Sequence, residues 1–267
     1  EFRRVLFRSV AEINIAAVEL ARRVVLASFK QVLIAGDVGP LGVRLAPFGR
    51  VQPEDARVAF REQITALAGA GVDLLIIETM TDLFEIREGV AAAREVAPHL
   101  PVVASMTFTR DDRTLLGDDP AKVARKVSET GADFIGVNCS GGPHQILRIL
   151  NQMQAAVPDG LFSVMPNAGW PEQVGGRIMY PAGPEYFGDY ALAFWHAGAS
   201  LIGGCCGTTP AHIAVMRRSI DSTSKEEIDN GFSISIVERE ESLQEFEKPT
   251  QFAQKLAAGR FVVAVEM

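Results

Sequence analysis

Six short runs of apolar, often β-branched residues recur along this sequence, and each is followed by a stretch with helical periodicity. The runs begin 29 to 40 residues apart, the length of one strand plus one helix. Such continuously apolar runs are typical of parallel strands buried on both faces. The pattern therefore predicts an α/β fold built on a parallel sheet. The six runs are Leu33–Gly39, Asp73–Met80, Val102–Thr109, Asp133–Ser140, Phe162–Gly169 and Ser200–Gly207.

The segments around these runs carry apolar residues at the 3.6-residue spacing of amphipathic helices. Gly71 follows one of them as a C-terminal cap, and Pro120 opens another, a position where proline is favoured. The predicted helices are Ala11–Lys30, Asp55–Gly71, Thr81–Val96, Pro120–Gly131, His144–Val157, Tyr186–Gly198 and Pro210–Ile220.

Strands and helices in this alternation form either an open doubly wound sheet or a TIM-type β/α barrel. No Gly-x-Gly-x-x-Gly fingerprint follows the first run, which disfavours a nucleotide-binding doubly wound fold. Residues capable of chemistry stand at the carboxyl ends of several different runs, as they do in barrels. We therefore predict a barrel. A complete barrel has about eight strands, so we expect this chain to lack the first two.

The amino-acid composition changes after Ile220, and this change sets the expected domain boundaries. Residues 1–10 are interpreted as a cloning scar or truncated stump, and residues 11–220 as the partial barrel. Residues 221–250 are polar and acid-rich, as expected for a linker. Residues 251–267 contain a strand-like apolar run and are interpreted as the start of a second domain.

The net charge and the number of cysteines exclude several classes of function. The net charge of −7 offers no basic surface for nucleic acid, and no apolar run has the length of a membrane span. Three cysteines in 267 residues do not form a disulfide framework. We therefore expect a cytoplasmic protein with no nucleic-acid or membrane partner.

All three cysteines stand at the ends of predicted strands, Cys139 in one run and Cys205-Cys206 in the last. In a barrel these strand ends lie close together, and three thiolates with a fourth position open are a ligand set for zinc. Adjacent residues of a strand point to opposite faces, so the backbone must bend there, and Gly203, Gly204 and Gly207 permit it. Three buried free cysteines remain the alternative. The four histidines show no metal-ligand spacing.

A three-thiolate site with an open position suits a thiol substrate, because the metal favours the thiolate, which is the nucleophile. The implied reaction is attack on an electrophilic carbon, such as an activated methyl group. A β/α-barrel lyase or aldolase, with Glu78 as base and Gly203-Gly204 in a phosphate site, is the competing enzyme class. It leaves the clustered cysteines unexplained.

Several motifs, in order from about Asn14 to Ile220, resemble the homocysteine S-methyltransferase family. They are Gly36-Asp37-Val38-Gly39-Pro40, Ile77-Glu78-Thr79, Val137-Asn138-Cys139, Ser140-Gly141-Gly142-Pro143, Met165-Pro166-Asn167-Ala168-Gly169-Trp170-Pro171 and Gly203-Gly204-Cys205-Cys206-Gly207-Thr208-Thr209-Pro210.

The resemblance implies a zinc-dependent barrel that binds homocysteine through the metal and methylates it to methionine. By this resemblance Cys139, Cys205 and Cys206 are the zinc ligands, and Glu78 holds the amino group of homocysteine. Asn138 and Asn167 match motif positions near the substrate. The methyl donor stays open among methylfolate, S-methylmethionine, S-adenosylmethionine and a corrinoid partner.

The sequence also departs from the family pattern. The family begins with an Asp-Gly-Ala-Met-Gly-like strand and a Glu-Thr-Asn-Thr-like strand, and neither occurs here. An inactive partial barrel is therefore a further alternative. Phe252–Met267 resembles the opening strand of methylenetetrahydrofolate reductase, so we expect a fragment of a bifunctional protein in which that reductase is fused behind the methyltransferase.

Overall fold

The structure is a computed structural model that describes residues 9–174 and 176–222. The chain divides into two compact units, Glu1–Ser233 and Ile234–Met267. The second unit, together with nearly all of the predicted linker and the predicted reductase-like segment, lies outside the described residues. The domain boundaries proposed from the sequence therefore stay predictions.

The first unit is built on a six-stranded sheet in which every neighbouring pair is parallel. Its strand order, β1-β2-β3-β4-β5-β8, follows the chain without reversal, as in a β/α barrel and unlike a doubly wound sheet. Five of the six strands lie within a run predicted from the sequence, and β8 begins one residue before its run. The strands are β1 (Ala35–Val38), β2 (Leu74–Met80), β3 (Val102–Met106), β4 (Phe134–Cys139), β5 (Phe162–Pro166) and β8 (Ala199–Ile202).

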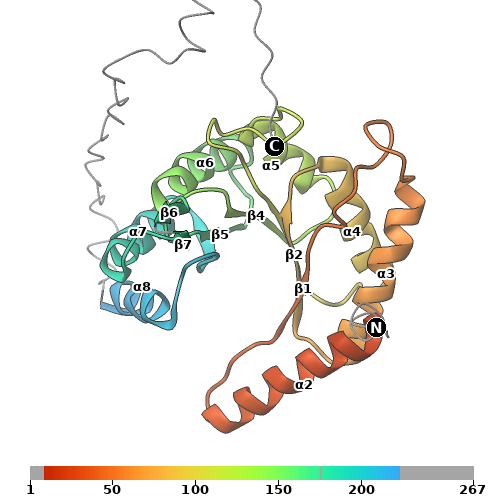
Figure 1. The fold of residues 1–267 in the computed structure, drawn as a ribbon, viewed down its shortest axis with the longest axis horizontal. Helices are drawn as coiled ribbons and strands as arrows, with labels where there is room; N and C mark the ends of the chain where they lie inside the picture. Colours follow the sequence, from red (N-terminus) through yellow and green to blue (C-terminus); the bar gives the residue numbers. More distant parts are fainter. Residues whose placement is uncertain (1–8, 175, 223–267) are drawn as a thin grey trace, which may run out of the picture. The chain divides into compact units, whose positions relative to one another are not determined.

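Helix α2 precedes β1 and each later helix follows a strand. Figure 1 shows α3 to α8 arranged along the outer side of the sheet. Each packs on the next, from α2 against α3 through to α7 against α8. This confirms the seven predicted helices to within a few residues at their ends. They are α2 (Val10–Ser28), α3 (Pro53–Gly69), α4 (Leu83–Val96), α5 (Pro120–Ser128), α6 (Pro143–Ala156), α7 (Pro184–His196) and α8 (Pro210–Ser222).

Local sequence explains where several helices begin. The carboxylate of Asp82 accepts a hydrogen bond from the backbone N–H of Phe84 and caps α4, while Asp119 caps α5 by accepting from Lys122 N–H. Proline occupies the first turn of α3, α5, α6 and α7, where its missing N–H costs no helical hydrogen bond.

The core lies between the sheet and the helices that cover it. All five residues of β3 are buried, as expected for a strand covered on both faces. Close packing is visible at Gly89 of α4, where an added Cβ would lie 3.2 Å from Ile77 of β2. The largest fully buried side chains include Phe60, Phe162, Phe187, Phe194, Ile64 and Leu75.

One element was not predicted. An antiparallel hairpin, β6 (Glu172–Val174) with β7 (Arg177–Met179), lies in the connection between β5 and α7. The last predicted run also ends sooner than expected, because β8 stops at Ile202 and Cys205-Cys206 lie in the loop beyond it. None of the helices in the described part of the chain has the length and apolar character that a membrane span requires.

Candidate metal centre

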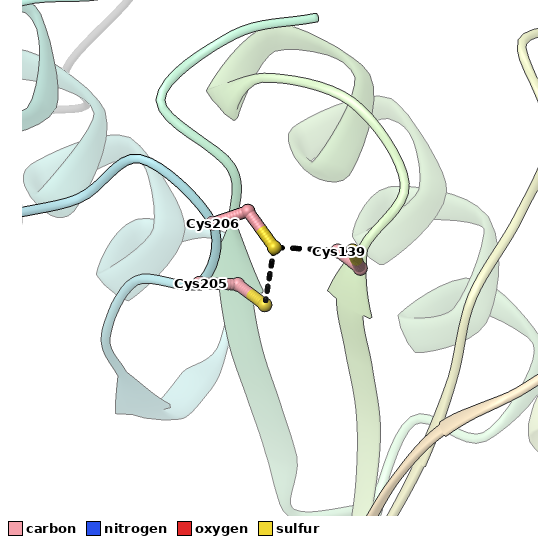
Figure 2. Close-up of side chains that lie close together, drawn as sticks. All are labelled: Cys139, Cys205 and Cys206. Atoms are coloured by element: carbon pink, nitrogen blue, oxygen red, sulfur yellow. Dashed lines mark hydrogen bonds between the residues drawn. The ribbon is translucent and has the colours of Figure 1, made fainter. Parts of the chain in front are cut away.

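The three cysteine side chains converge at the carboxyl ends of β4 and β8 (Figure 2). The Sγ atom of Cys206 lies 3.9 Å from Sγ of Cys139 and 3.9 Å from Sγ of Cys205. All three sulfurs lie within 4.8 Å of one another, and they form the one such cluster of potential metal ligands among residues 9–174 and 176–222. The convergence predicted from the strand ends is thus present.

Cys139 is presented by an unusual backbone conformation at the end of β4. Cys139 and Ser140 both lie in the left-handed region, with φ of 56° and 53°. Residues with a side chain adopt this region only when surrounding interactions hold them there. The Ser140 hydroxyl supplies such interactions, since it accepts a hydrogen bond from Phe108 N–H at 2.8 Å and lies 3.2 Å from the hydroxyl of Thr107.

Cys205 and Cys206 reach the same point because the chain beyond β8 runs beside the end of β5. Cys205 N–H donates to the carbonyl of Pro166 at 2.8 Å, and Ala168 N–H donates to the carbonyl of Cys206 at 2.8 Å. Gly207 then turns the chain with φ of 78°. The bend expected from the neighbouring glycines is therefore present, and it allows two adjacent side chains to share one site.

Two buried asparagines hold these segments in place. Asn167 accepts from Cys206 N–H at 3.1 Å and donates through Nδ2 to the Ser140 carbonyl at 3.2 Å. Asn138 accepts from Thr79 N–H at 2.9 Å and donates to the Thr79 hydroxyl at 2.7 Å. Asn138 Nδ2 also lies 3.9 Å from Sγ of Cys205. Both amides thus orient the cysteine loops, and their predicted contact with substrate stays a prediction.

The sulfur geometry fits a zinc ion. In a tetrahedral site with zinc–sulfur bonds of about 2.3 Å, the sulfurs lie about 3.8 Å apart. Two of the three separations observed here, 3.9 Å each, match that spacing without rearrangement. Thiolate sulfur is a preferred ligand of zinc, and Cys206 is exposed, so a small molecule can approach the cluster.

The thiols of Cys139 and Cys205 do not ionise independently. A hydrogen bond from Cys205 lowers the pKa of the Cys139 thiol. The same interaction, together with burial, raises the pKa of Cys205. One proton shared between the sulfurs of Cys139 and Cys205 accounts for both the lowered pKa of Cys139 and the raised pKa of Cys205. The interaction thus eases loss of the Cys139 proton, and the thiolate is the form that binds a metal.

Glu78 lies near this cluster at the carboxyl end of β2, and Asn138 Nδ2 lies 3.4 Å from its Oε2. Burial raises the pKa of Glu78, and the negative charge of Asp37 raises it further. Burial also raises the pKa of Asp37 itself. Two partly buried carboxyl groups therefore flank one side of the site, where they would favour a bound cation.

Two further residues of the site were not predicted to have a role, although Thr79 belongs to the Ile77-Glu78-Thr79 motif. Thr79 adopts a left-handed conformation, with φ of 59°, and bonds to Asn138 through both its N–H and its hydroxyl. Tyr180 packs against Gly207, where an added Cβ would lie 2.3 Å from its ring. Burial and the neighbouring Cys206 raise the pKa of Tyr180. Tyr180 follows the hairpin that was not predicted, and no motif pointed to it.

Fold and site together define an α/β protein with a six-stranded parallel sheet and a cluster of three cysteines at the carboxyl ends of its strands. The sequence model of the homocysteine S-methyltransferase family matches residues 3–220. The chain therefore belongs to that family.

Relatives and solved structures agree with this assignment. The methionine synthases of Mycobacterium tuberculosis and Mycobacterium leprae are 33% and 34% identical over 202 residues, which cover 73% and 71% of this chain. This chain spans only 16% of the length of either relative. The apo crystal structure of the Escherichia coli homocysteine methyltransferase MmuM superposes with a TM-score of 0.63 at 27% identity, covering 78% of this chain and 74% of that chain. Its metallated form gives 0.62 at 28% identity, covering 78% and 70%.

Proposed function

We propose that this chain binds one zinc ion through Cys139, Cys205 and Cys206 and transfers a methyl group to the thiol of homocysteine, forming methionine. The observation that carries the proposal is the triangle of three sulfurs, with two separations of 3.9 Å. Membership of the family supports the reaction type. A metallated crystal form of the E. coli homocysteine methyltransferase supports a metal at this centre.

A zinc ion held by Cys139, Cys205 and Cys206 would lower the pKa of the homocysteine thiol and so supply the nucleophilic thiolate. The protein residues then orient the amino acid. The carboxylate of Glu78 would hold the ammonium group, and the nearby negative charge of Asp37 would favour the same cation. Asn138 and Asn167 keep the cysteine loops fixed during the transfer.

The methyl transfer itself is a direct displacement. A bond forms between the homocysteine sulfur and the methyl carbon, while the bond from that carbon to the donor breaks and its electron pair leaves with the donor. The thiol proton is lost before this step. The donor stays open, and a fused methylenetetrahydrofolate reductase domain remains our proposal for the neighbouring segment. A reducing, cytoplasmic location agrees with three free thiols.

Metal content and methionine formation test the proposal directly. The purified chain should contain about one zinc per molecule, with sulfur ligation in X-ray absorption that gains one sulfur when homocysteine is added. Replacing Cys139 with alanine should abolish both zinc binding and methionine formation. A lyase or aldolase would retain its activity in that variant. A metal-free protein that is indifferent to chelators would refute the zinc proposal, and a zinc-bound chain without turnover would identify an inactive partial barrel.

A further inference from the structure

His212 is a buried imidazole close in sequence to the Cys205-Cys206 pair. It is 6% exposed and lies in the first turn of α8, the helix that follows the double-cysteine loop. Its ring meets the ring of Phe187 edge-on, with 4.9 Å between the ring centres. A polar ring is buried without a large penalty only when its nitrogens are hydrogen-bonded, and both nitrogens of His212 have partners.

The two ring nitrogens of His212 contact different segments of the chain. Nδ1 accepts a hydrogen bond from the backbone N–H of Thr209 at 3.1 Å, and the Thr209 hydroxyl lies 2.9 Å from the same atom. Because a backbone N–H can only donate, we assign the proton of the neutral ring to Nε2. Nε2 then donates to the carbonyl of Ala182 at 3.0 Å. One side chain thus joins the start of α8 to the segment that precedes α7.

These bonds complete a closed ring of contacts beside the double-cysteine loop. Ala182 N–H donates to the carbonyl of Ala168 at 2.9 Å, and Ala168 N–H donates to the carbonyl of Cys206 at 2.8 Å. The chain from Cys206 to His212 and the bond from His212 to Ala182 close the ring. Tyr180 and Ala182 also pack against a buried apolar cluster that contains Ala168. Both backbone polar groups of Ala182 are therefore tied to segments that shape the metal centre.

Tyr180, two residues before Ala182, borders the metal centre. A Cβ added at Gly207 would overlap the Tyr180 ring, so the ring packs directly on the residue after Cys206. Burial raises the pKa of the Tyr180 phenol, and so does negative charge on each of the three cysteines, which places the phenol near all three sulfurs. Because Cys206 is the exposed cysteine, Tyr180 lies beside the side from which a small molecule can approach.

We propose that His212 is a positioning residue of this centre. By fixing the carbonyl of Ala182, it keeps the ring of Tyr180 beside the Cys205-Cys206 loop, where that ring forms one wall of the space that homocysteine enters. The proposal rests on the proposed function, which supplies the substrate for that space. His212 acts through Tyr180 and supplies no ligand to the metal.

Three substitutions at His212 separate its two hydrogen bonds. His212→Phe keeps an aromatic ring of similar shape and removes both bonds. His212→Asn is short, so it retains an acceptor for Thr209 N–H but loses the bond to Ala182. His212→Gln is longer and extends an amide N–H to the Ala182 carbonyl. A histidine that only caps α8 can be replaced by asparagine, whereas one that positions Tyr180 can be replaced only by glutamine.

Tyrosine ring signals in NMR spectra report the position of Tyr180 without any substrate. The chain has three tyrosines, so isotope labelling of tyrosine gives three sets of ring signals, and Tyr180→Phe assigns one of them. We expect the Tyr180 signals to move toward their unfolded-chain positions in His212→Phe and His212→Asn and to stay in place in His212→Gln. Unchanged signals in His212→Phe would overturn the proposal. If His212→Phe does not fold, equal signals in the other two variants would do so.

Steady-state kinetics connect that position to the substrate. The Cys205-Cys206 loop keeps its own bonds to Pro166 and Ala168, so every His212 variant should retain zinc. We expect the KM for homocysteine to rise about tenfold in His212→Phe and His212→Asn, with kcat unchanged. His212→Gln and the control His99→Phe, at an exposed histidine, should keep the wild-type KM. A wild-type KM in His212→Asn would contradict the proposal. A wild-type chain without turnover would refute methyl transfer instead, and the tyrosine signals would still decide the role of His212.

Discussion

The side-chain carbonyl of Asn167 accepts a hydrogen bond of 3.1 Å from the backbone N–H of Cys206. Nδ2 of the same side chain donates to the carbonyl of Ser140, directly after Cys139. One buried amide thus spans the two segments that supply all three sulfurs. It sets the separation of those segments although it contributes no metal ligand.

Replacing Asn167 with alanine should therefore weaken zinc binding while leaving all three thiols in the protein. Outer-sphere partners of metal ligands typically contribute 10- to 100-fold to metal affinity. We expect a loss of that size in competition titrations with a chromophoric chelator. Asn151→Ala, at an exposed position on α6, serves as the control and should bind zinc as the wild type does. Equal affinities for the two variants would show that Asn167 has no role in shaping the site.

Glu78 provides a second test, directed at the amino acid rather than at the metal. A hydrogen bond to a charged group contributes about 1.5–3 kcal/mol. Glu78→Gln should therefore raise the KM for homocysteine on the order of 10- to 100-fold, with zinc content unchanged. Glu54→Gln, on the exposed side of α3, is the matched control. An unchanged KM in Glu78→Gln would remove Glu78 from the substrate pocket.

The same substitution has a pH-dependent effect on stability. Burial and the charge of Asp37 raise the pKa of Glu78 above its ordinary 4.5, so the folded protein disfavours the ionised form. The stability contributed by the protonated group is lost as pH rises through the raised pKa. Without ligand at pH 7, Glu78→Gln should unfold at a higher temperature than the wild type. The difference in unfolding temperature should vanish well below pH 4.5, where Glu78 is protonated in the folded and the unfolded protein alike. Calorimetry between pH 7 and this range measures the difference, and a lower unfolding temperature for Glu78→Gln at pH 7 would contradict the prediction.

The strands and helices were predictable because they depend on local periodicity. Each predicted run overlaps an observed strand and each predicted helix overlaps an observed one. The hairpin of β6 and β7 was missed because its strands are three residues long and show no apolar alternation. The Gly-Gly pair between them, a common two-residue hairpin turn, was the available signal.

The convergence of the three cysteines was predictable for a different reason. The carboxyl ends of parallel strands meet at one edge, so Cys139 and the Cys205-Cys206 pair had to approach one another. The left-handed conformations of Thr79, Cys139 and Ser140 were not predictable, since nothing in those side chains favours positive φ. Tertiary hydrogen bonds from residues distant in sequence impose them, and the sequence does not display such pairings.

A fourth prediction concerns the ion pairs between α3 and α4. The carboxylate of Glu88, 1% exposed, accepts from Arg57 Nη2 at 2.6 Å and Nε at 2.8 Å. Removing a partner of a buried charge is strongly destabilising. Because Arg87 Nε, 3.1 Å from Glu88 Oε1, stays as a second partner, Arg57→Ala should lower the free energy of unfolding by about 2–3 kcal/mol. Arg61, one turn later, lies 3.7 Å from the exposed Glu95. Arg61→Ala should cost about 0–1 kcal/mol. Urea unfolding of both variants makes the comparison, and equal losses would contradict it.

The last prediction distinguishes two glycines of the double-cysteine motif. Gly207 has φ of 78°, and an added Cβ would lie 2.3 Å from the ring of Tyr180. An alanine there must adopt a strained conformation, at a cost of about 1–3 kcal/mol, and must also displace Tyr180. At Gly203 the nearest atom would be Met165 Cγ at 3.4 Å, an ordinary contact. Gly207→Ala should therefore lower both the unfolding temperature and the zinc affinity, whereas Gly203→Ala should retain zinc. Thermal unfolding with and without added zinc measures both effects, and the prediction fails if Gly207→Ala binds zinc as tightly as Gly203→Ala.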